Sequence, residues 1–296
     1  MIDLLSSELM QRALLAALMV GATAPVIGTY LVQRRLALLG DGIGHIALTG
    51  VAAGWLAGVL AGLTTPDALA LPGAMIIAVL GAVGIEWVRT SGHVAGDVAM
   101  AILFYGGIAG GALLIKIAGG TSANLMSYLF GSIATVSTAD LWWTAALGGV
   151  VLLIGIGLRG VLFSVSHDEE FARASGLPVA GLAMLLAALT ALTVTVAMRV
   201  VGLLLVSALM IVPVATAQVV ARSFTRTMIL ASVIGVSVST TGLLLTYWYD
   251  LPPGATIVVL AIGLYALVSV IQSRRRPRRS PEPHSQPAPD DVIVSR

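Results

Sequence analysis

Long apolar stretches separated by short polar segments occupy most of the chain. An α-helix needs about 20 mostly apolar residues to cross a membrane, and the chain offers nine such stretches. These candidate spans are 10–32, 42–63, 68–88, 95–116, 140–158, 179–198, 201–220, 227–248 and 254–272. Membrane β-strands would instead give short alternating segments. The pattern predicts an all-α fold, a polytopic transmembrane helical bundle of about eight to nine spans.

Composition supports the membrane assignment and narrows the chemistry. Of the 296 residues, 58% are hydrophobic and 10% are charged, whereas soluble domains carry about 25% charged residues. A soluble globular protein is therefore excluded. The chain has no Cys, which excludes a disulfide framework, thiolate metal ligation and an iron–sulfur cluster. Residues 1–272 hold ten basic and eleven acidic residues, so no nucleic-acid partner is indicated.

Basic residues predict the orientation, because Lys and Arg are enriched in cytoplasmic loops. With the N-terminus outside, only Arg12, Lys116 and Arg199 fall on the external side. The cytoplasmic side then holds six Arg of residues 273–296 together with Arg34, Arg35, Arg89, Arg159, Arg173, Arg222 and Arg226. An odd number of spans places the C-terminus in the cytoplasm.

The chain divides into a transmembrane domain, residues 1–272, and an Arg- and Pro-rich cytoplasmic tail, residues 273–296. The tail is too polar to pack, so we expect it to be disordered and to rest on anionic membrane lipid. The external segment 119–140 is mildly apolar, and we expect it to fold against the membrane. Asp3 and Glu8 stand where a signal peptide would carry basic residues, so the N-terminal segment is expected to be retained.

Asp41 and His45 are the candidate metal ligands. They lie four residues apart at the start of a predicted span, about 40° apart around a helix, so both side chains reach one point. Carboxylate oxygen and imidazole nitrogen together suit Zn²⁺, Mn²⁺ or Fe²⁺, and ionisable groups at membrane depth are functional candidates. The alternative, equally supported by the local pattern, is that Asp41 caps the helix and His45 is a hydrogen-bonded interior histidine.

Glycines at spacing four follow on the same predicted helix, at positions 50, 54, 58 and 62. They lie on the side away from His45, and we expect them to pack closely on a neighbouring helix.

A short helix is predicted at about residues 166–178, in the most charged loop of the body. Its sequence HDEEFARASGLPV begins with acids and stops at a Gly, which is the usual order for a helix. The run from His167 to Glu170 is expected to be a solvated helix start rather than a metal cluster. Glu86 and Asp97, on either side of another turn, are likewise expected to be solvated.

Several enzymatic motifs are absent from the sequence. The only lysine, Lys116, lies in LLIKIAGG, so the phosphate-binding loop GxxxxGK[ST] does not occur. HExxH and GxSxG are also absent, which argues against an intramembrane metalloprotease or an α/β-hydrolase. We therefore expect no catalytic residues, and energy must come from a partner or an ion gradient.

Five blocks together resemble the membrane permease subunit of bacterial zinc/manganese/iron ABC importers, over most of residues 10–272. They are RRLALLGDGIGHIALTGVAAG (34–54), LMSYLFGSIATVSTADL (125–141), DEEFARASGLPV (168–179), RVVGLLLVSALMIVPVATAQ (199–218) and DLPPGATIVVL (250–260). The GDGIGH block matches the family's Gly-Asp-Ala-x-Ser-His signature at Asp41 and His45. Gly42 replaces the usual Ala and Gly44 the usual Ser, which removes one oxygen donor.

The resemblance implies a permease fold of the vitamin B12/metal-chelate-like type and a complete importer around it. Its partners would be cytosolic ATPase subunits, an extracytoplasmic metal-binding protein and a second permease subunit, as a homodimer, in the inner membrane of a bacterium. The short cytoplasmic helix corresponds to the family's coupling helix, which docks on the ATPase through the positions of Glu170, Ala172, Ala174 and Gly176. No cofactor is implied, only the transported ion held transiently, zinc first and manganese second.

Two other classes of transporter stay open. A gradient-driven secondary metal transporter would need no ATPase and would favour broken helices in inverted repeats. An ABC permease for a metal chelate or a cofactor would need a wide pathway that is indifferent to loss of Asp41 and His45.

Overall fold

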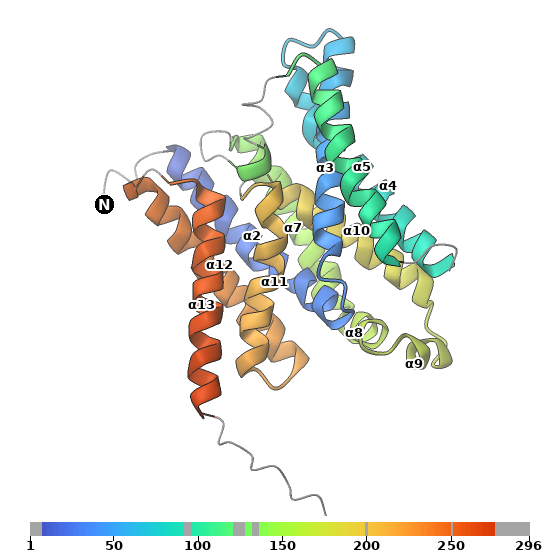
Figure 1. The fold of residues 1–296 in the computed structure, drawn as a ribbon, viewed down its shortest axis with the longest axis vertical. Coiled ribbons are helices and arrows are strands. Elements are labelled where there is room, and N and C mark those ends of the chain that lie inside the picture. The colour runs from blue at the N-terminus through green and yellow to red at the C-terminus, as the bar shows by residue number, and fades with distance from the viewer. Residues whose placement is uncertain are drawn as a thin grey trace, which may run out of the picture.

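A computed structural model describes residues 8–91, 96–120, 128–131, 136–198, 201–249 and 251–275, and these ranges contain helices and no strand (Figure 1). The longer helices are α2 (Glu8–Gln33), α3 (Leu39–Leu60), α4 (Ala70–Ser91), α5 (Gly96–Ile117), α7 (Thr138–Gly157), α10 (Val179–Ala197), α11 (Leu203–Val220), α12 (Phe224–Tyr249) and α13 (Pro253–Arg275). Three short helices complete the described chain, η1 (Pro66–Leu69), α8 (Arg159–His167) and α9 (Glu169–Ala174).

Eight of the described helices are long and apolar enough to cross a membrane, and α11 is a shorter apolar helix. The predicted helical bundle of about eight to nine spans is thus confirmed. The candidate span 201–220 corresponds to α11, which begins directly after Gly202, a residue with φ of +91°.

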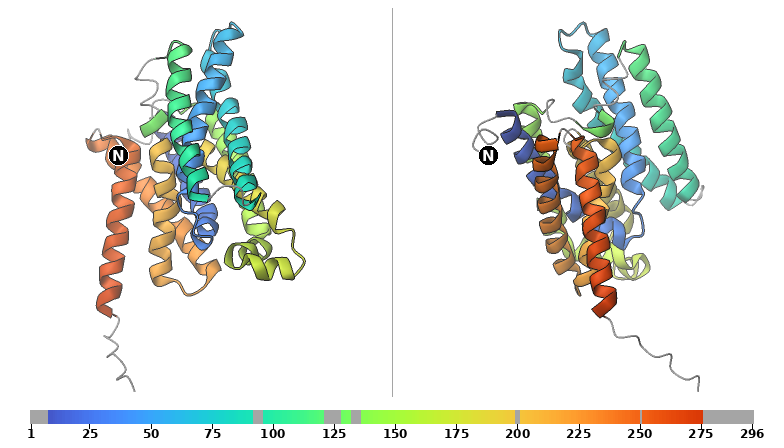
Figure 2. Two further views of the ribbon diagram at one scale, coloured as in Figure 1. Left: turned by 45° about the vertical axis from the view of Figure 1, so that its right-hand side comes forward. Right: turned by 60° about the vertical axis from the view of Figure 1, so that its left-hand side comes forward.

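α2, dark blue in Figure 2, is the most buried of the candidate spans and packs on α7, α11 and α12. Glycine permits the closest approaches. A Cβ at Gly28 would lie 2.0 Å from the carbonyl oxygen of Met210 on α11, and one at Gly21 would lie 2.8 Å from the carbonyl oxygen of Gly235 on α12. Without a hydrophobic driving force between helices in lipid, such small-residue contacts provide the packing that holds them together.

A second group, α3, α4 and α5, packs on α10 and α11 and reaches the upper end of Figure 1. The predicted glycine contact is present for three of the four glycines. Cβ atoms at Gly50, Gly54 and Gly58 would lie 2.6, 2.1 and 2.4 Å from carbonyl oxygens of the η1–α4 segment. Gly62 is the exception, because it follows the end of α3 with φ of +66° and its Cβ would meet nothing.

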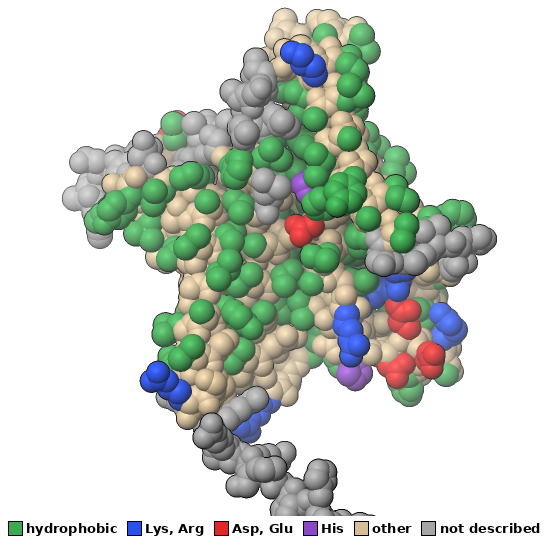
Figure 3. Space-filling model, in the orientation of Figure 1, with side chains coloured by type: hydrophobic (Ala, Val, Ile, Leu, Met, Phe, Trp, Pro, Cys, Tyr) green, Lys and Arg blue, Asp and Glu red, His purple; other side chains and the backbone are tan. Residues whose placement is uncertain are grey.

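On the face drawn in Figure 3, charged side chains lie mainly toward the ends, and hydrophobic side chains cover much of the middle, where acidic and histidine side chains are also visible. Lys116 is on the last turn of α5. The opposite end, which we call the arginine-rich end, carries the last turn of α4, the short helices α8 and α9, and the segments that follow α2 and α11. Basic residues at this end include Arg34, Arg35, Arg89, Arg159, Arg173, Arg222 and Arg226. The assignment of this end to the cytoplasm remains a prediction.

Part of the predicted external segment packs against the bundle. Residues 128–131 lie against two helix starts, since a Cβ at Gly202 would be 2.3 Å from the nitrogen of Gly131 and one at Gly254 would be 2.9 Å from the carbonyl oxygen of Phe130. α7 then begins with a capping box between Ser137 and Asp140. The tail from residue 276 onward lies outside the described residues, so its predicted disorder stays a prediction.

Candidate metal site

Asp41 lies in the first turn of α3, which begins at Leu39. The N-cap residue is Leu38, and no side-chain hydrogen bond caps the helix there. Asp41 therefore does not have the capping role considered for it. Asp41 is half-buried and lines a cavity of about 500 Å³ between α3 and α5. The other lining residues are Arg35, Leu36, Ala37, Leu38, Leu39, Met100, Ala101, Phe104 and Tyr105. The carboxylate therefore lines an opening whose wall is mostly apolar apart from Arg35 and Tyr105.

His45 lies one turn further along α3 and is 5% exposed. Its Nδ1 is buried and has no hydrogen-bond partner among the described residues. The ring meets the edge of Phe104 with centroids 4.2 Å apart, and Phe104 also lines the cavity of Asp41. A buried polar atom without a partner requires an explanation, and a free imidazole nitrogen is a common metal ligand. The hydrogen-bonded interior histidine is thus not what the structure contains.

α5 holds the backbone of His45 in place. A Cβ at Gly107 would lie 2.5 Å from the carbonyl carbon of His45, so a side chain there is excluded. One turn beyond His45, the Thr49 hydroxyl donates a hydrogen bond to the Gly107 carbonyl at 2.8 Å. The contact between α3 and α5 is therefore closest at the candidate ligand itself.

Two positions at which the sequence departs from the GDAxSH signature are next to apolar side chains. A Cβ at Gly42 would lie 2.9 Å from the sulfur of Met100, and one at Gly44 would lie 3.3 Å from Leu203. Met100 thus uses space that an alanine methyl would need, and the thioether lies beside the first turn of α3. In this chain the candidate ligands on α3 are Asp41, which lines the cavity, and His45, whose ring contacts the cavity residue Phe104; position 44 provides no serine hydroxyl.

The described residues hold no group of three or more His, Cys, Asp or Glu side chains that could bind a metal ion. One carboxylate and one imidazole per chain make an open site, in contrast to the four-ligand cages of structural zinc. Such a pair is suited to hold an ion briefly. The assignment of Asp41 and His45 as ligands stays a prediction.

The short helix at the arginine-rich end is shorter than the predicted 166–178, because α9 covers Glu169–Ala174 and residues 166 and 167 belong to α8. The Asp168 carboxylate accepts a hydrogen bond from the backbone nitrogen of Phe171 at 2.9 Å and so caps α9. Gly176 ends it with φ of +80°, a conformation that favours glycine. Glu170, Ala174 and Gly176 are exposed.

Ala172 differs from the other three predicted coupling residues. It is fully buried and packs in a small cluster with Val165 and Val179, so it seats α9 on its neighbours α8 and α10. Phe171, which sequence reasoning did not single out, is 64% exposed on the same helix. The signal available in the sequence was an aromatic residue within a short helix that was predicted to lie at the surface.

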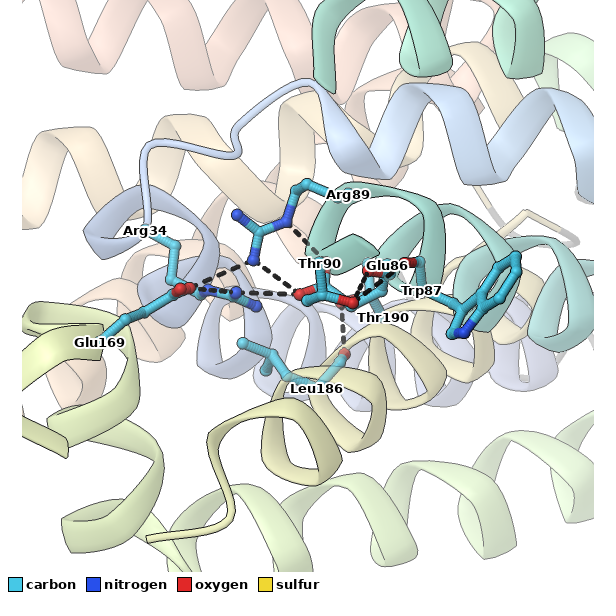
Figure 4. Close-up of polar contacts among 8 residues, drawn as sticks. All are labelled: Arg34, Glu86, Trp87, Arg89, Thr90, Glu169, Leu186 and Thr190. Atoms are coloured by element: carbon cyan, nitrogen blue, oxygen red, sulfur yellow. Dashed lines mark hydrogen bonds and ion pairs between the residues drawn. The ribbon is translucent and has the colours of Figure 1, made fainter. Parts of the chain in front are cut away.

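The expectation that Glu86 is a solvated charge was wrong. Its side chain is 1% exposed and binds Arg34 at 3.0 Å and Arg89 at 2.7 Å (Figure 4). Glu169, which was expected to belong to a solvated helix start, also contacts both arginines, at 2.6 and 3.2 Å, so that expectation was wrong for this residue. We call these four residues the charge cluster. Sequence spacing did not reveal it because Arg34 is 52 residues from Glu86 and 135 from Glu169. The side chain of Asp97 lies outside the described residues.

The arginines keep Glu169 ionised. Burial alone would raise the pKa of this carboxyl, but the hydrogen bonds and charges of Arg34 and Arg89 outweigh it and hold the pKa below its ordinary value. Glu169 is therefore a fixed negative charge under physiological conditions.

Membrane-length helices around a half-buried carboxylate at a cavity are typical of a polytopic membrane transport protein. The family model of the ABC 3 transport family matches residues 6–272. The chain belongs to this family and is a non-catalytic permease subunit of an ABC transporter, whose ATPase is a separate subunit.

Curated relatives match over nearly the whole chain. The manganese transport system membrane protein MntC of Halalkalibacterium halodurans is 37% identical over 90% of this chain and 88% of its own length. The manganese import system permease protein ScaB of Streptococcus parasanguinis is 31% identical, with 90% and 92% covered. A probable iron transport system membrane protein of Haemophilus influenzae is also 31% identical, with 90% and 95% covered.

Two solved structures have the same fold. PsaBC from Streptococcus pneumoniae in complex with Fab superposes with a TM-score of 0.80 at 30% identity, covering 93% of this chain and 98% of that one. A metal-chelate type ABC transporter in an inward-facing conformation gives a TM-score of 0.66 at 19% identity, over 89% and 87%, a likeness of fold alone. The predicted permease fold is confirmed.

Proposed function

We propose that this chain is the permease of an ATP-driven importer of a divalent transition metal, with manganese as the first candidate and zinc and iron after it. The observation that carries the proposal is the pair on α3: the Asp41 carboxylate on the cavity wall, and the buried His45 Nδ1 that lacks a partner. The similarity to permeases named for manganese and iron supports the same class of cargo.

Manganese takes first place over zinc for two reasons. Two of the similar permeases described above are named for manganese transport. Oxygen donors also suit Mn²⁺, whereas imidazole accepts several transition metals, so the Asp41–His45 pair does not require zinc.

Two ligands per chain suit transport because the ion must be released again. An ion that enters the apolar bundle loses hydration, and protein donors must replace part of it. A closed four-ligand cage would trap the ion. We propose that a second copy of the permease, or water, completes the coordination, with the pathway at the interface of a homodimer.

The two ends of the bundle take different partners in this proposal. The arginine-rich end faces the cytoplasm of a bacterial inner membrane, with the C-terminus on that side, and α9 docks on the ATPase through Glu170, Ala174 and Gly176 with Phe171 beside them. An extracytoplasmic metal-binding protein delivers the ion at the Lys116 end. Lipid surrounds the hydrophobic middle.

The test is the metal content of cells by mass spectrometry in chelator-limited medium. The gene is deleted and then restored as wild type, as His45→Ala, or as His284→Ala, a matched histidine change in the tail, with membrane abundance verified. We expect deletion to lower one divalent metal selectively, wild type and His284→Ala to restore it, and His45→Ala to fail.

Other outcomes are equally informative. Unchanged metal content on deletion, in a strain without a compensating importer, would refute metal import. Restoration by His45→Ala would refute the ligand assignment and favour a chelate as cargo.

A further inference from the structure

The charge cluster joins three parts of the chain that are far apart in sequence. Arg34 lies directly after α2, Glu86 and Arg89 are on the last turns of α4, and Glu169 begins α9 (Figure 4). Glu86 accepts two hydrogen bonds from Arg89, from Nε to Oε2 at 3.1 Å and from Nη2 to Oε1 at 2.7 Å. A single carboxylate oxygen of Glu169, Oε1, accepts hydrogen bonds from both Arg34 and Arg89. Two positive and two negative charges thus form a closed network.

Burial makes this network a firm attachment. The side chains of Arg34 and Glu86 are 3% and 1% exposed. Charges that are removed from water must remain paired, because losing one partner leaves the other uncompensated in a poor dielectric. If Glu169 moves, Arg34 is therefore drawn with it or loses one of its two carboxylates.

The rest of α9 is held only lightly. It has six residues, and Ala172 is its buried apolar contact, packed with Val165 and Val179 of the adjoining helices. One parallel polar contact joins the same regions: Gln33 Nε2, at the end of α2, is 2.7 Å from Nδ1 of His167, just before α9. Polar contacts therefore provide the connection from α9 to the end of α2.

The turn that begins at Arg34 leads directly to the candidate metal site. Residues 34–38 connect α2 to α3, and Arg35 within this turn has φ of +59°, a strained value for a residue with a side chain. Arg35 and Leu38 line the same cavity as Asp41. Glu86 and Arg89 are attached to α3 as well, through the close packing of α4 on α3.

We propose that Glu169 is a positioning residue of the transport cycle. Through the charge cluster it transmits displacement of α9 to the turn 34–38 and so to the cavity at Asp41. This inference rests on the proposed function, in which the ATPase docks on α9. The two neighbouring acids then have separate tasks: Glu170 faces outward to the ATPase, and Glu169 faces the arginines.

The experiment uses the complete importer, this permease with its ATPase and binding protein, in proteoliposomes loaded with a fluorescent metal indicator. It measures manganese ions taken up per ATP hydrolysed, the metal concentration for half-maximal uptake, and co-purification of the ATPase. Glu169→Gln removes the charge and keeps the shape, and Glu169→Asp keeps the charge on a shorter side chain. Glu8→Gln is the matched control, in an exposed ion pair with Arg12.

For Glu169→Gln we expect the ATPase to co-purify and hydrolyse ATP while the ions per ATP fall by about 5–150-fold, the usual span of coupling between sites. The half-maximal metal concentration should stay unchanged, because the ligands are intact. Glu169→Asp should retain more coupling than Glu169→Gln, and Glu8→Gln should match wild type.

Three results would overturn the inference: wild-type ions per ATP in Glu169→Gln, equal loss in Glu169→Gln and Glu169→Asp, or loss of ATPase co-purification, which would mean docking rather than transmission. If Glu169→Gln does not accumulate in the membrane, Arg89→Gln, which removes the charge of the partially exposed partner of Glu169, takes its place. Reduced coupling with intact docking supports the inference, and wild-type coupling overturns it. Failure of the wild-type importer to take up metal with ATP would instead count against the proposed function.

Discussion

Removing the Glu86 carboxylate should destabilise the chain substantially. Glu86→Ala leaves Arg34, 3% exposed, with one carboxylate in place of two, and leaves Arg89 with Glu169 alone. Breaking a buried pair by removing one partner costs about 3–5 kcal/mol. Because Arg34 keeps Glu169 and Arg89 is 30% exposed to solvent, we expect the lower end, about 3 kcal/mol.

The assay is thermal unfolding of the purified protein in detergent, followed by the fluorescence of its five tryptophans. At about 2–4 °C per kcal/mol for chains of 150–250 residues, Glu86→Ala should lower Tm by about 6–12 °C. Glu86→Gln, which still accepts hydrogen bonds, should fall between Glu86→Ala and wild type. Glu8→Ala removes an exposed ion pair and should change Tm little. Equal Tm values for Glu86→Ala and Glu8→Ala would refute the view that burial makes the charge cluster stabilising.

Three further predictions concern the site, the surface helix and pH. Gly107→Leu should lower Tm and metal uptake, since overpacking typically costs about 1–3 kcal/mol. Gly106→Leu is the matched control, because a Cβ at Gly106 would meet nothing. Equal Tm and uptake in the two variants would contradict the prediction. Gly176→Val should abolish ATP-driven uptake with normal membrane insertion, because φ of +80° excludes a β-branched residue, and normal uptake would remove Gly176 from the docking surface. Glu169 has a pKa below the ordinary 4.5, so its contribution to stability is present above pH 4.5 and is lost as the pH falls through the lowered pKa. The Tm difference between wild type and Glu169→Gln should therefore shrink in acid. A Tm difference that does not depend on pH would contradict this prediction.

The helices could be predicted because a membrane demands long apolar segments, which hydropathy measures directly. Asp41 and His45 could be paired for a similar reason, since a spacing of four fixes a shared helix face. The unpartnered Nδ1 of His45 and the contact of its ring with Phe104 could not be predicted, because both depend on how α5 packs on α3.

Glu86 shows the limit most clearly. Its neighbours along the chain, including Arg89, are compatible with a solvated turn. Its burial comes from Arg34 and Glu169, which reach it only after three distant segments have assembled. Ala172 is similar: the sequence placed it on the correct helix, and only the packing with Val165 and Val179 shows that it faces inward.

The glycines of α3 also restrict which motions the permease can make. Carbonyl oxygens lie within 2.1–2.6 Å of the Cβ positions at Gly50, Gly54 and Gly58, over successive turns. Sliding α3 along its neighbour by one residue would drive side chains into those carbonyls, so shear between the two helices is blocked. Any displacement of α3 along its axis is therefore expected to carry α4 with it as one unit.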